Sequence, residues 1–148
     1  MKLNADRSLL FVACGDDDII DVIDVETLEV VDGIPTGPSP EVFEFSADES
    51  QIYVSNEEDS MMEIIDIESR ITVHDVPTGA EPEGVALAPE AGIIYVASEV
   101  ADMVHVIDAD AGVVTDNIIV GTRPRRFVMT PSTNELWVSA ELSSEIYI

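Results

Sequence analysis

The chain has 148 residues, of which 46% are hydrophobic, enough for one domain with a buried core and too many for a disordered segment. It carries 31 Asp and Glu against 6 Lys and Arg, a formal net charge of −25, which repels nucleic acid and anionic lipid and excludes both as partners. Insertion into a membrane is also excluded, because no apolar run approaches the roughly 18 residues that a spanning helix needs. The acidic excess is typical of halophilic proteins, whose carboxylates form a solvated coat.

One sequence unit of about 42 residues recurs along the chain without insertion or deletion. Each unit carries one aromatic residue followed by valine, and the four aromatic residues are Phe11, Tyr53, Tyr95 and Trp137. An aspartate after isoleucine recurs at Asp24, Asp66 and Asp108, and a Gly-x-x-Pro turn at Gly37–Pro40, Gly79–Pro82 and Gly121–Pro124. Unrelated markers that share one spacing indicate a repeat architecture.

Short β-type runs, not helical spacing, make up each unit. In chain order, the units are 1–39, 40–81, 82–123 and the incomplete 124–148. In the second unit the predicted strands are Val42–Phe45, Gln51–Ser55, Met62–Asp66 and Ile71–Val76. Four strands in about 40 residues predict an all-β fold, a β-propeller with about 3.5 four-stranded blades in a single partial domain. The alternatives fit less well, since β-solenoid coils are shorter and a sandwich keeps no strict period.

The Gly-x-x-Pro turn joins the outer strand of one blade to the inner strand of the next. Glycine is expected to supply a positive φ in this turn, and proline begins the inner strand without needing an amide donor.

The run Ile52-Tyr53-Val54-Ser55-Asn56 resembles the YVTN-type β-propeller repeat family. Its variants here are Leu10–Cys14, Ile94–Ser98 and Leu136–Ala140, and the departures are Glu49 and Ala91, where the family usually has glycine. The resemblance covers essentially the whole chain. It implies the propeller fold and an extracellular, cell-surface or periplasmic location. Family members include archaeal surface-layer proteins and the cofactor-bearing propellers of some dehydrogenases and nitrite reductases, so the fold alone does not select a function.

The phase of the repeat places the last residue, Ile148, inside the third strand of the fourth unit. An open arc of about 3.5 blades exposes apolar blade faces and an unpaired strand edge, and both promote association. We therefore expect a homodimer that completes a ring of about seven or eight blades. The alternative is a fragment of a longer propeller.

The basic cluster Arg123, Arg125 and Arg126 replaces Glu81, Glu83 and Gly84 of the preceding unit. Three guanidinium groups in an anionic protein suit a carboxylate or phosphate ligand. The alternative is ion pairing with acids of the neighbouring blade, such as Glu83 or Glu41.

A second candidate site consists of acidic loop residues that share a face with the Gly-x-x-Pro turns. Equivalent positions hold Glu57, Glu99 and Glu141, which could bind Ca²⁺ or another hard cation or could form a solvated rim. The lone Cys14 is expected to be a buried thiol. No metal, haem or other cofactor is expected at His74 or His105, and no residues form a catalytic motif.

These observations favour a non-enzymatic interaction or scaffold module that forms one part of a ring and can also bind protein partners. The alternative is a fragment of an enzyme or cofactor-binding propeller, lactonase-like or quinone-linked, that holds an anionic ligand near the arginine cluster.

Overall fold

The computed structural model describes residues 1–88, 92–130 and 135–148. In these ranges the strands form four antiparallel sheets, each a meander in chain order. Blade 1 holds β1 (Lys2–Leu3), β2 (Leu9–Cys14), β3 (Ile19–Asp24) and β4 (Val30–Pro35), with the short 3-10 helix η1 (Gly15–Asp17) between β2 and β3. Blade 2 holds β5 (Pro40–Phe45), β6 (Gln51–Asn56), β7 (Met61–Asp66) and β8 (Ile71–Pro77). Blade 3 holds β9 (Pro82–Ala88), β10 (Ile93–Ser98), β11 (Met103–Asp108) and β12 (Val113–Ile119). Blade 4 holds β13 (Pro124–Met129), β14 (Leu136–Ala140) and β15 (Glu145–Tyr147).

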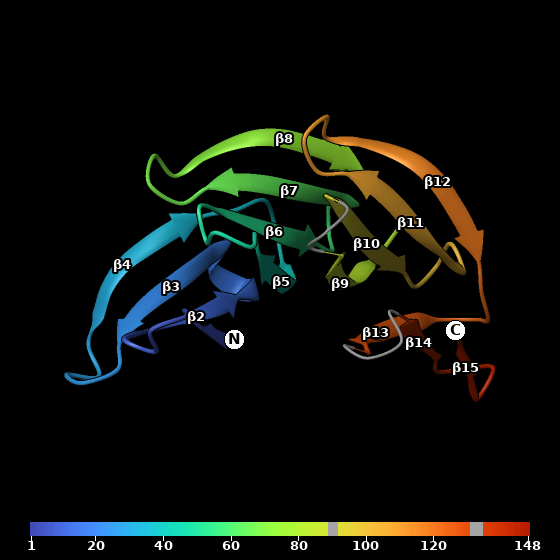
Figure 1. Ribbon diagram of the computed structural model, residues 1–148, viewed down its shortest axis with the longest axis horizontal. Helices are drawn as coiled ribbons and strands as arrows, with labels where there is room; N and C mark the ends of the chain where they lie inside the picture. The colour runs from blue at the N-terminus through green and yellow to red at the C-terminus, as the bar shows by residue number, and fades with distance from the viewer. Residues whose placement is uncertain (89–91, 131–134) are drawn as a thin grey trace.

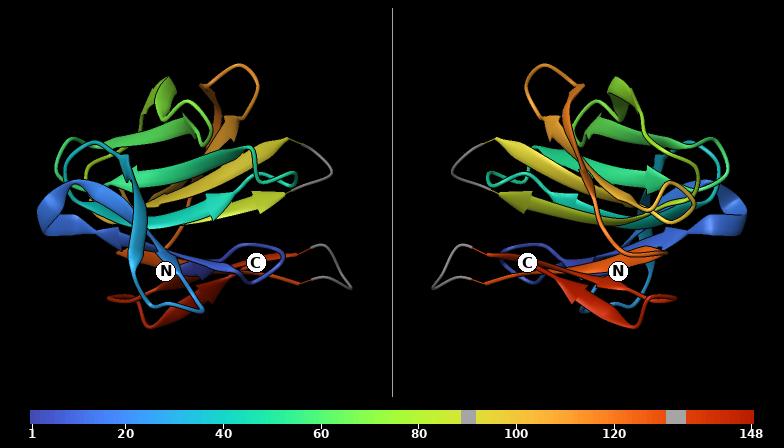
Figure 2. Two further views of the ribbon diagram at one scale, coloured as in Figure 1. Left: turned by 90° about the vertical axis from the view of Figure 1, so that its left-hand side faces the viewer. Right: turned by 90° about the vertical axis from the view of Figure 1, so that its right-hand side faces the viewer.

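The four predicted strands of the second unit are confirmed within one or two residues at each end, and so is the all-β propeller architecture. Figure 1 shows the blades as an arc, with the outer strands β4, β8 and β12 along its convex rim and the inner strands β5, β9 and β13 toward its middle. Blades 1 and 4 form the two ends of this arc. Figure 2 shows from the sides that the strands of blades 2 and 3 run across the molecule above those of blades 1 and 4.

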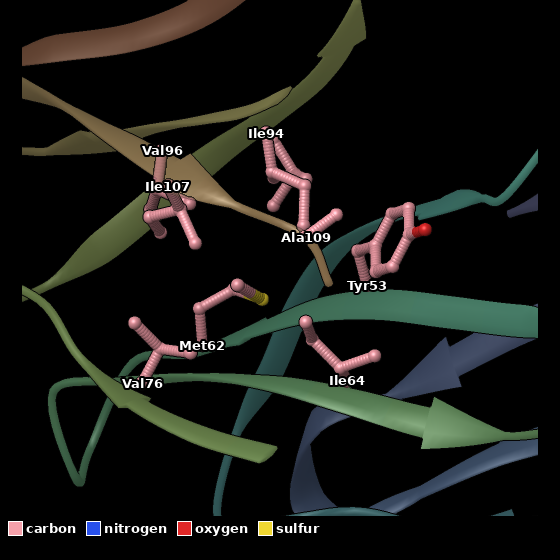
Figure 3. Packing of buried hydrophobic residues seen from close by; sticks show 9 residues of the cluster. Tyr53, Met62, Ile64, Val76, Ile94, Val96, Ile107 and Ala109 are labelled. Atoms are coloured by element: carbon pink, nitrogen blue, oxygen red, sulfur yellow. The ribbon is translucent and has the colours of Figure 1, made fainter. Parts of the chain in front are cut away.

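Neighbouring blades pack through two sets of apolar positions. The forward face of a blade points to the next blade in the chain and consists, in blade 2, of Tyr53, Met62, Ile64 and Val76. The backward face points to the preceding blade and consists, in blade 3, of Val85, Ile94, Val96 and Ile107. Figure 3 shows the forward face of blade 2 directed at the backward face of blade 3.

The contact between blades 1 and 2 repeats this arrangement one sequence unit earlier. Its forward face is Phe11, Ile20, Val22 and Ile34, and its backward face is Phe43, Ile52, Val54 and Ile65. Burial of such side chains contributes about 1.5–3 kcal/mol each. The same type of apolar interface therefore stabilises the junction of blades 1 and 2 and the junction of blades 2 and 3.

Cys14, at the end of β2, is only partly buried. Its Sγ donates a hydrogen bond of 3.5 Å to the carbonyl of Val12. The prediction of a buried thiol is therefore met only in part, because the strand lies in the terminal blade of the arc, where the burial of apolar strands is incomplete.

The turn between blades also differs from the sequence-based expectation. Positive φ occurs at the residue before each proline, at Ser39 (57°), Glu81 (54°) and Arg123 (64°), and not at the glycine of the turn. The glycines serve close packing instead: a Cβ on Gly79 would lie 2.5 Å from the Cβ of Ala101. The prediction of a positive φ at these glycines was therefore wrong, because space, and not backbone conformation, requires glycine there.

Among the described residues, no helix has the length and apolar character required to cross a bilayer.

Candidate functional site: an arginine–glutamate cluster between blades 3 and 4

The turns between blades and the loops between the second and third strands lie on the same face, as the strand order predicts. The backbone amides of Glu57, Glu99 and Glu141 each donate a hydrogen bond of 2.9 Å to the carbonyl of the residue before a turn proline. For Glu141 this acceptor is Arg123, whose own amide donates to Asp102 Oδ1 at 3.0 Å. These bonds fix the backbone from which the charged side chains project.

Six charged side chains meet where blade 3 contacts blade 4, and we call them the arginine–glutamate cluster. Its members are Glu83, Glu99, Arg123, Arg125, Arg126 and Glu141. The side chains of Glu83 and Glu99 are only 5% and 3% exposed, whereas the arginines remain in contact with solvent. Two buried carboxylates are thus covered by three guanidinium groups.

Arg125 connects three carboxylates. Its Nη2 donates to Glu83 Oε1 at 2.7 Å, and its Nη1 lies 3.0 Å from Glu99 Oε1 and 3.2 Å from Glu141 Oε2. Arg126 Nη1 donates to the other oxygen of Glu83 at 2.5 Å. Because the two arginines use both oxygens of Glu83, this carboxylate joins the inner strands β9 and β13.

Arg123 closes the cluster from the turn. Its Nε donates to Glu99 Oε2 at 2.5 Å and lies 3.6 Å from Glu141 Oε2. The Glu99 carboxylate supports the positive charge, so it raises the pKa of Arg123. Arg123, which has a left-handed backbone, therefore ties the turn to the loop between β10 and β11.

The surroundings of Glu99 in the cluster disfavour its charged form. Burial raises the pKa of Glu99; the hydrogen bond from Arg123 opposes the shift and the nearby Glu83 adds to it. Burial also raises the pKa of Glu41 on β5, and the carboxylates of Glu83 and Glu57 contribute in the same direction. Acidic side chains thus lie on the inner strands of both blades, Glu83 on β9 in the cluster and Glu41 on β5 in blade 2.

The structure brings the three predicted arginines together, and each is paired with acids of the chain itself. Glu83, the partner that the ion-pairing alternative named, contacts both Arg125 and Arg126. A groove of about 300 Å³ lies beside the cluster and is lined by Arg123, Glu99 and Asp102, among others. Its charged lining consists of three acidic side chains, Glu81, Glu99 and Asp102, and one arginine, Arg123. The arginines as a ligand site thus stay a prediction.

The predicted carboxylate arc is only partly brought together. Glu99 and Glu141 both contact Arg123 and Arg125. Glu57 belongs to blade 2 instead, where its carboxylate adds to the rise that burial causes in the pKa of Glu41. In the described part of the chain, no group of three or more His, Cys, Asp or Glu side chains could hold a metal ion. A cation site at these residues stays a prediction without structural support.

Sequence reasoning missed a polar contact in which the third strand of a blade holds the incoming turn. The Gly37 amide donates to Glu63 Oε2 at 2.7 Å, and in the next blade the Gly79 amide donates to His105 Nε2 at 2.8 Å. Glu63 and His105 occupy the same position of successive units. The signal in the sequence was a polar residue at one repeat position of an otherwise apolar strand. Because the residue type differs from unit to unit, this position does not stand out as part of the repeat.

Together the four antiparallel meanders, their radial order and the paired blade faces define an open β-propeller arc. A model of the YNCE-like β-propeller family matches residues 1–92, and the chain belongs to this family. The resemblance to the YVTN-type propeller repeat is thereby confirmed. No functionally curated protein matches the chain.

Solved structures with a similar fold include both enzymes and a WD40 domain. Kuenenia stuttgartiensis hydrazine synthase superposes with a TM-score of 0.78 at 19% identity, covering 99% of this chain and 46% of that one. The WD40 β-propeller domain of Doa1 superposes with a TM-score of 0.83 at 11% identity, covering 98% of this chain and 47% of that one. Dihydro-heme d1 dehydrogenase NirN, solved in complex with DHE, superposes with a TM-score of 0.74 at 16% identity, covering 94% of this chain and 31% of that one. The chain spans less than half the length of these proteins, and at such identities the likeness shows the fold alone.

Proposed function

We propose that the chain is a non-enzymatic interaction module of the β-propeller type that works inside a closed ring, and that a second copy completes this ring. The observation that carries the proposal is the pair of apolar blade faces at the two ends of the arc. Inside the chain, the forward faces of blades 1 and 2 are each covered by the backward face of the next blade, whereas among the described residues of one copy the backward face of blade 1 and the forward face of blade 4 have no such cover.

The two end faces belong to complementary sets of repeat positions. The backward face of blade 1 consists of Met1, Leu10, Val12 and Ile23, each one unit before its buried counterpart in blade 2. The forward face of blade 4 consists of Trp137, Ile146 and Ile148, each two units after its buried counterpart in blade 2. Met1 is 81% exposed and Ile146 is 64% exposed.

A groove of about 380 Å³ at blade 4 supports the same pairing. It is lined mainly by apolar side chains of β13, β14 and β15, including Val128, Trp137 and Ile146. Large exposed apolar faces promote association. A second copy turned by a two-fold axis presents its blade 1 to this groove while its own blade 4 meets the first copy's blade 1. Both end faces are then covered by the same type of apolar contact that joins neighbouring blades within one chain.

The pairing of charges in the arginine–glutamate cluster supports a non-enzymatic role. Each arginine there contacts at least one carboxylate of the chain, so the three positive charges are compensated before any ligand arrives. In this proposal the cluster stabilises the junction between blades 3 and 4, and binding of other proteins falls to the rim and faces of the ring.

Light scattering coupled to gel filtration tests the ring. We expect a molar mass twice the 16.0 kDa of one chain, falling to one chain in Ile146→Asp. Ile71→Asp, on the exposed rim of blade 2, is the matched control and leaves the dimer intact. A wild-type chain that stays monomeric over the accessible concentration range contradicts the proposal.

A second candidate function is binding of an anionic ligand at the arginine cluster, as in a fragment of a lactonase-like or quinone-linked propeller. The partly exposed guanidinium group of Arg126 favours it. Thermal shift against sugar acids, lactones and quinone cofactors tests it. Stabilisation by one of these that Arg125→Ala and Arg126→Ala both abolish would establish the ligand site in place of a purely scaffolding role.

A further inference from the structure

We propose that the groove between the loops of blades 3 and 4, on the face that carries the Gly-x-x-Pro turns, docks a segment of another protein in which lysine alternates with aliphatic residues. The two loops join β10 to β11 and β14 to β15, and the turn between them joins β12 to β13. The proposal rests on the proposed interaction role, to which it adds a surface and the chemistry of a partner. It does not depend on the dimer, because no residue that lines the groove belongs to the two end faces.

One repeat position on this face changes from acidic to aliphatic along the chain. It holds Asp16 in blade 1 and Glu58 in blade 2, but Val100 in blade 3 and Leu142 in blade 4. Val100 is 62% exposed and Leu142 is 67% exposed, and both line the same groove of about 300 Å³. Two exposed aliphatic side chains beside one groove, at a position that is acidic elsewhere in a chain of net charge −25, indicate a contact surface.

Backbone hydrogen bonds hold the two loops in the same way. The Val100 amide donates to the carbonyl of Ala80 at 3.4 Å, and the Leu142 amide donates to the carbonyl of Thr122 at 3.1 Å. Each bond joins a loop to the turn that enters its own blade. Val100 thus stays exposed although the turns before and after blade 3 are both in place. Because these bonds fix the loops within the chain itself, a partner meets a groove that is already formed and loses less free energy to ordering.

The charged side chains of the groove leave a surplus of negative charge for a partner. Its arginine, Arg123, already donates through Nε to Glu99 Oε2 at 2.5 Å. Asp102 accepts the Arg123 amide with Oδ1 at 3.0 Å, which uses one of its two oxygens. Within residues 1–88, 92–130 and 135–148, the carboxylate of Glu81 takes part in no hydrogen bond or ion pair. Glu81 and Asp102 are therefore the carboxylates that can receive a cationic side chain.

Charge and apolar contact together define the partner. A lysine that reaches these two carboxylates lays its aliphatic stem along Val100 or Leu142, and aliphatic neighbours in the same segment cover the rest of both side chains. A second copy of this chain is not the partner, because its surface is acidic and its only lysine, Lys2, pairs with Glu44 at 2.7 Å.

Three fluorescently labelled hexapeptides separate the two contributions. The first alternates leucine and lysine, the second alternates serine and lysine, and the third alternates leucine and glutamate. Fluorescence anisotropy with the full chain measures binding at about 0.15 M NaCl, where attraction to the acidic surface is screened beyond about 8 Å. We expect the leucine–lysine peptide to bind about tenfold more tightly than the serine–lysine peptide, and the leucine–glutamate peptide not to bind.

Variants of the chain assign the binding to the groove. Val100→Ser and Leu142→Ser remove apolar surface without a change of charge, and each should weaken binding of the leucine–lysine peptide about fivefold. Glu81→Gln should weaken binding of both lysine peptides. Glu58→Gln is the matched control, because it removes the same charge from an exposed position on the same face of blade 2, and it should leave binding nearly unchanged.

Absence of binding by the leucine–lysine peptide overturns the proposal. Equal binding of the two lysine peptides, or a loss in Glu58→Gln as large as in Glu81→Gln, also overturns it, because either result would mean that the acidic surface attracts cations without a defined site. The ring is judged by the molar mass of the chain alone. A monomeric chain would therefore leave the groove to be judged by the peptides, and a failed groove would leave the ring intact.

Discussion

The backbone amide of Gly79 donates a hydrogen bond of 2.8 Å to Nε2 of His105, which is buried in the third strand of blade 3. Since Nε2 accepts this bond, the proton of the neutral ring lies on Nδ1, which donates to Asn117 Oδ1 at 2.6 Å. Both ring nitrogens are thus engaged only when the imidazole is neutral, and the turn that enters blade 3 depends on that protonation state.

This relationship predicts lower stability in mild acid. Burial lowers the pKa of His105 in the folded chain, and the bond to Asn117 opposes the shift. The unfolded histidine, with a pKa of about 6.5, therefore binds a proton first as the pH falls. The contribution of His105 is fully present above about pH 6.5 and is lost progressively as the pH falls from there through the lowered pKa of the folded state. Urea unfolding at several pH values measures it.

His105→Glu is the sharpest variant, because Glu63 already accepts the equivalent amide of Gly37 in blade 2. We expect it to keep the turn and to remove the part of the acid sensitivity between about pH 7 and pH 5.5 that belongs to the imidazole. His105→Ala should cost about 1–2 kcal/mol near neutral pH, because it leaves the partly buried amide of Gly79 without an acceptor. His74→Gln is the control, and an equal loss of acid sensitivity in this variant would contradict the role assigned to His105.

The constant repeat period with its turn markers was sufficient to predict the strands, the blades and the face that carries the turns. Such features depend on local alternation and on turn chemistry, which each unit contains in full. The partners of individual side chains could not be predicted in this way. Glu99 looked like a member of a metal-binding arc because its equivalents are also glutamates, yet the structure places it against Arg123 and Arg125. That contact depends on how blade 3 and blade 4 pack, which no single unit encodes.

Arg125 should stabilise the chain mainly because of the two carboxylates that it covers. Arg125→Met leaves the buried Glu83 and Glu99 with fewer counter-charges, while the arginine itself is 30% exposed. Breaking a fully buried pair costs about 3–5 kcal/mol, and partial exposure reduces this to about 2 kcal/mol near pH 8. Because the pKa of Glu99 is already raised, this carboxyl can take up a proton, and the penalty should shrink toward pH 5.

The measurement is the free energy of unfolding in urea at the two pH values. Arg70→Met is the matched control, because Arg70 pairs with Asp32 at the surface and both side chains are 41% exposed. An exposed pair of this kind contributes little to stability, because solvent and salt screen it. A loss in Arg125→Met no larger than in Arg70→Met would show that the cluster does not hold blades 3 and 4 together.

Gly84 is predicted to be the least tolerant glycine at the same junction. A Cβ on Gly84 would lie 2.4 Å from the backbone oxygen of Arg125, and that oxygen belongs to strand β13 and cannot move alone. Gly84→Ala should therefore destabilise the chain by about 1–3 kcal/mol. Gly33→Ala is the comparison, since its Cβ would meet only the flexible end of Ile19 at 2.6 Å. Thermal or urea unfolding of the two variants should separate them, and similar losses would contradict a close contact of blades 3 and 4 at Gly84.

The acidic surface predicts a stability that rises with salt. With a net charge of −25, the carboxylates repel one another across the folded surface more strongly than in the expanded unfolded chain. Raising NaCl from about 0.05 M to about 1 M shortens the screening length from above 10 Å to about 3 Å, and this repulsion is largely removed. The urea midpoint should increase over that range, with most of the gain at the lower concentrations, where screening changes most. Sodium sulfate at matched ionic strength should add a further increase through stronger burial of apolar surface. A midpoint that stays constant or falls in NaCl would mean that the carboxylates are compensated by local contacts such as those of Arg123 and Arg125, and that the coat imposes no net repulsion.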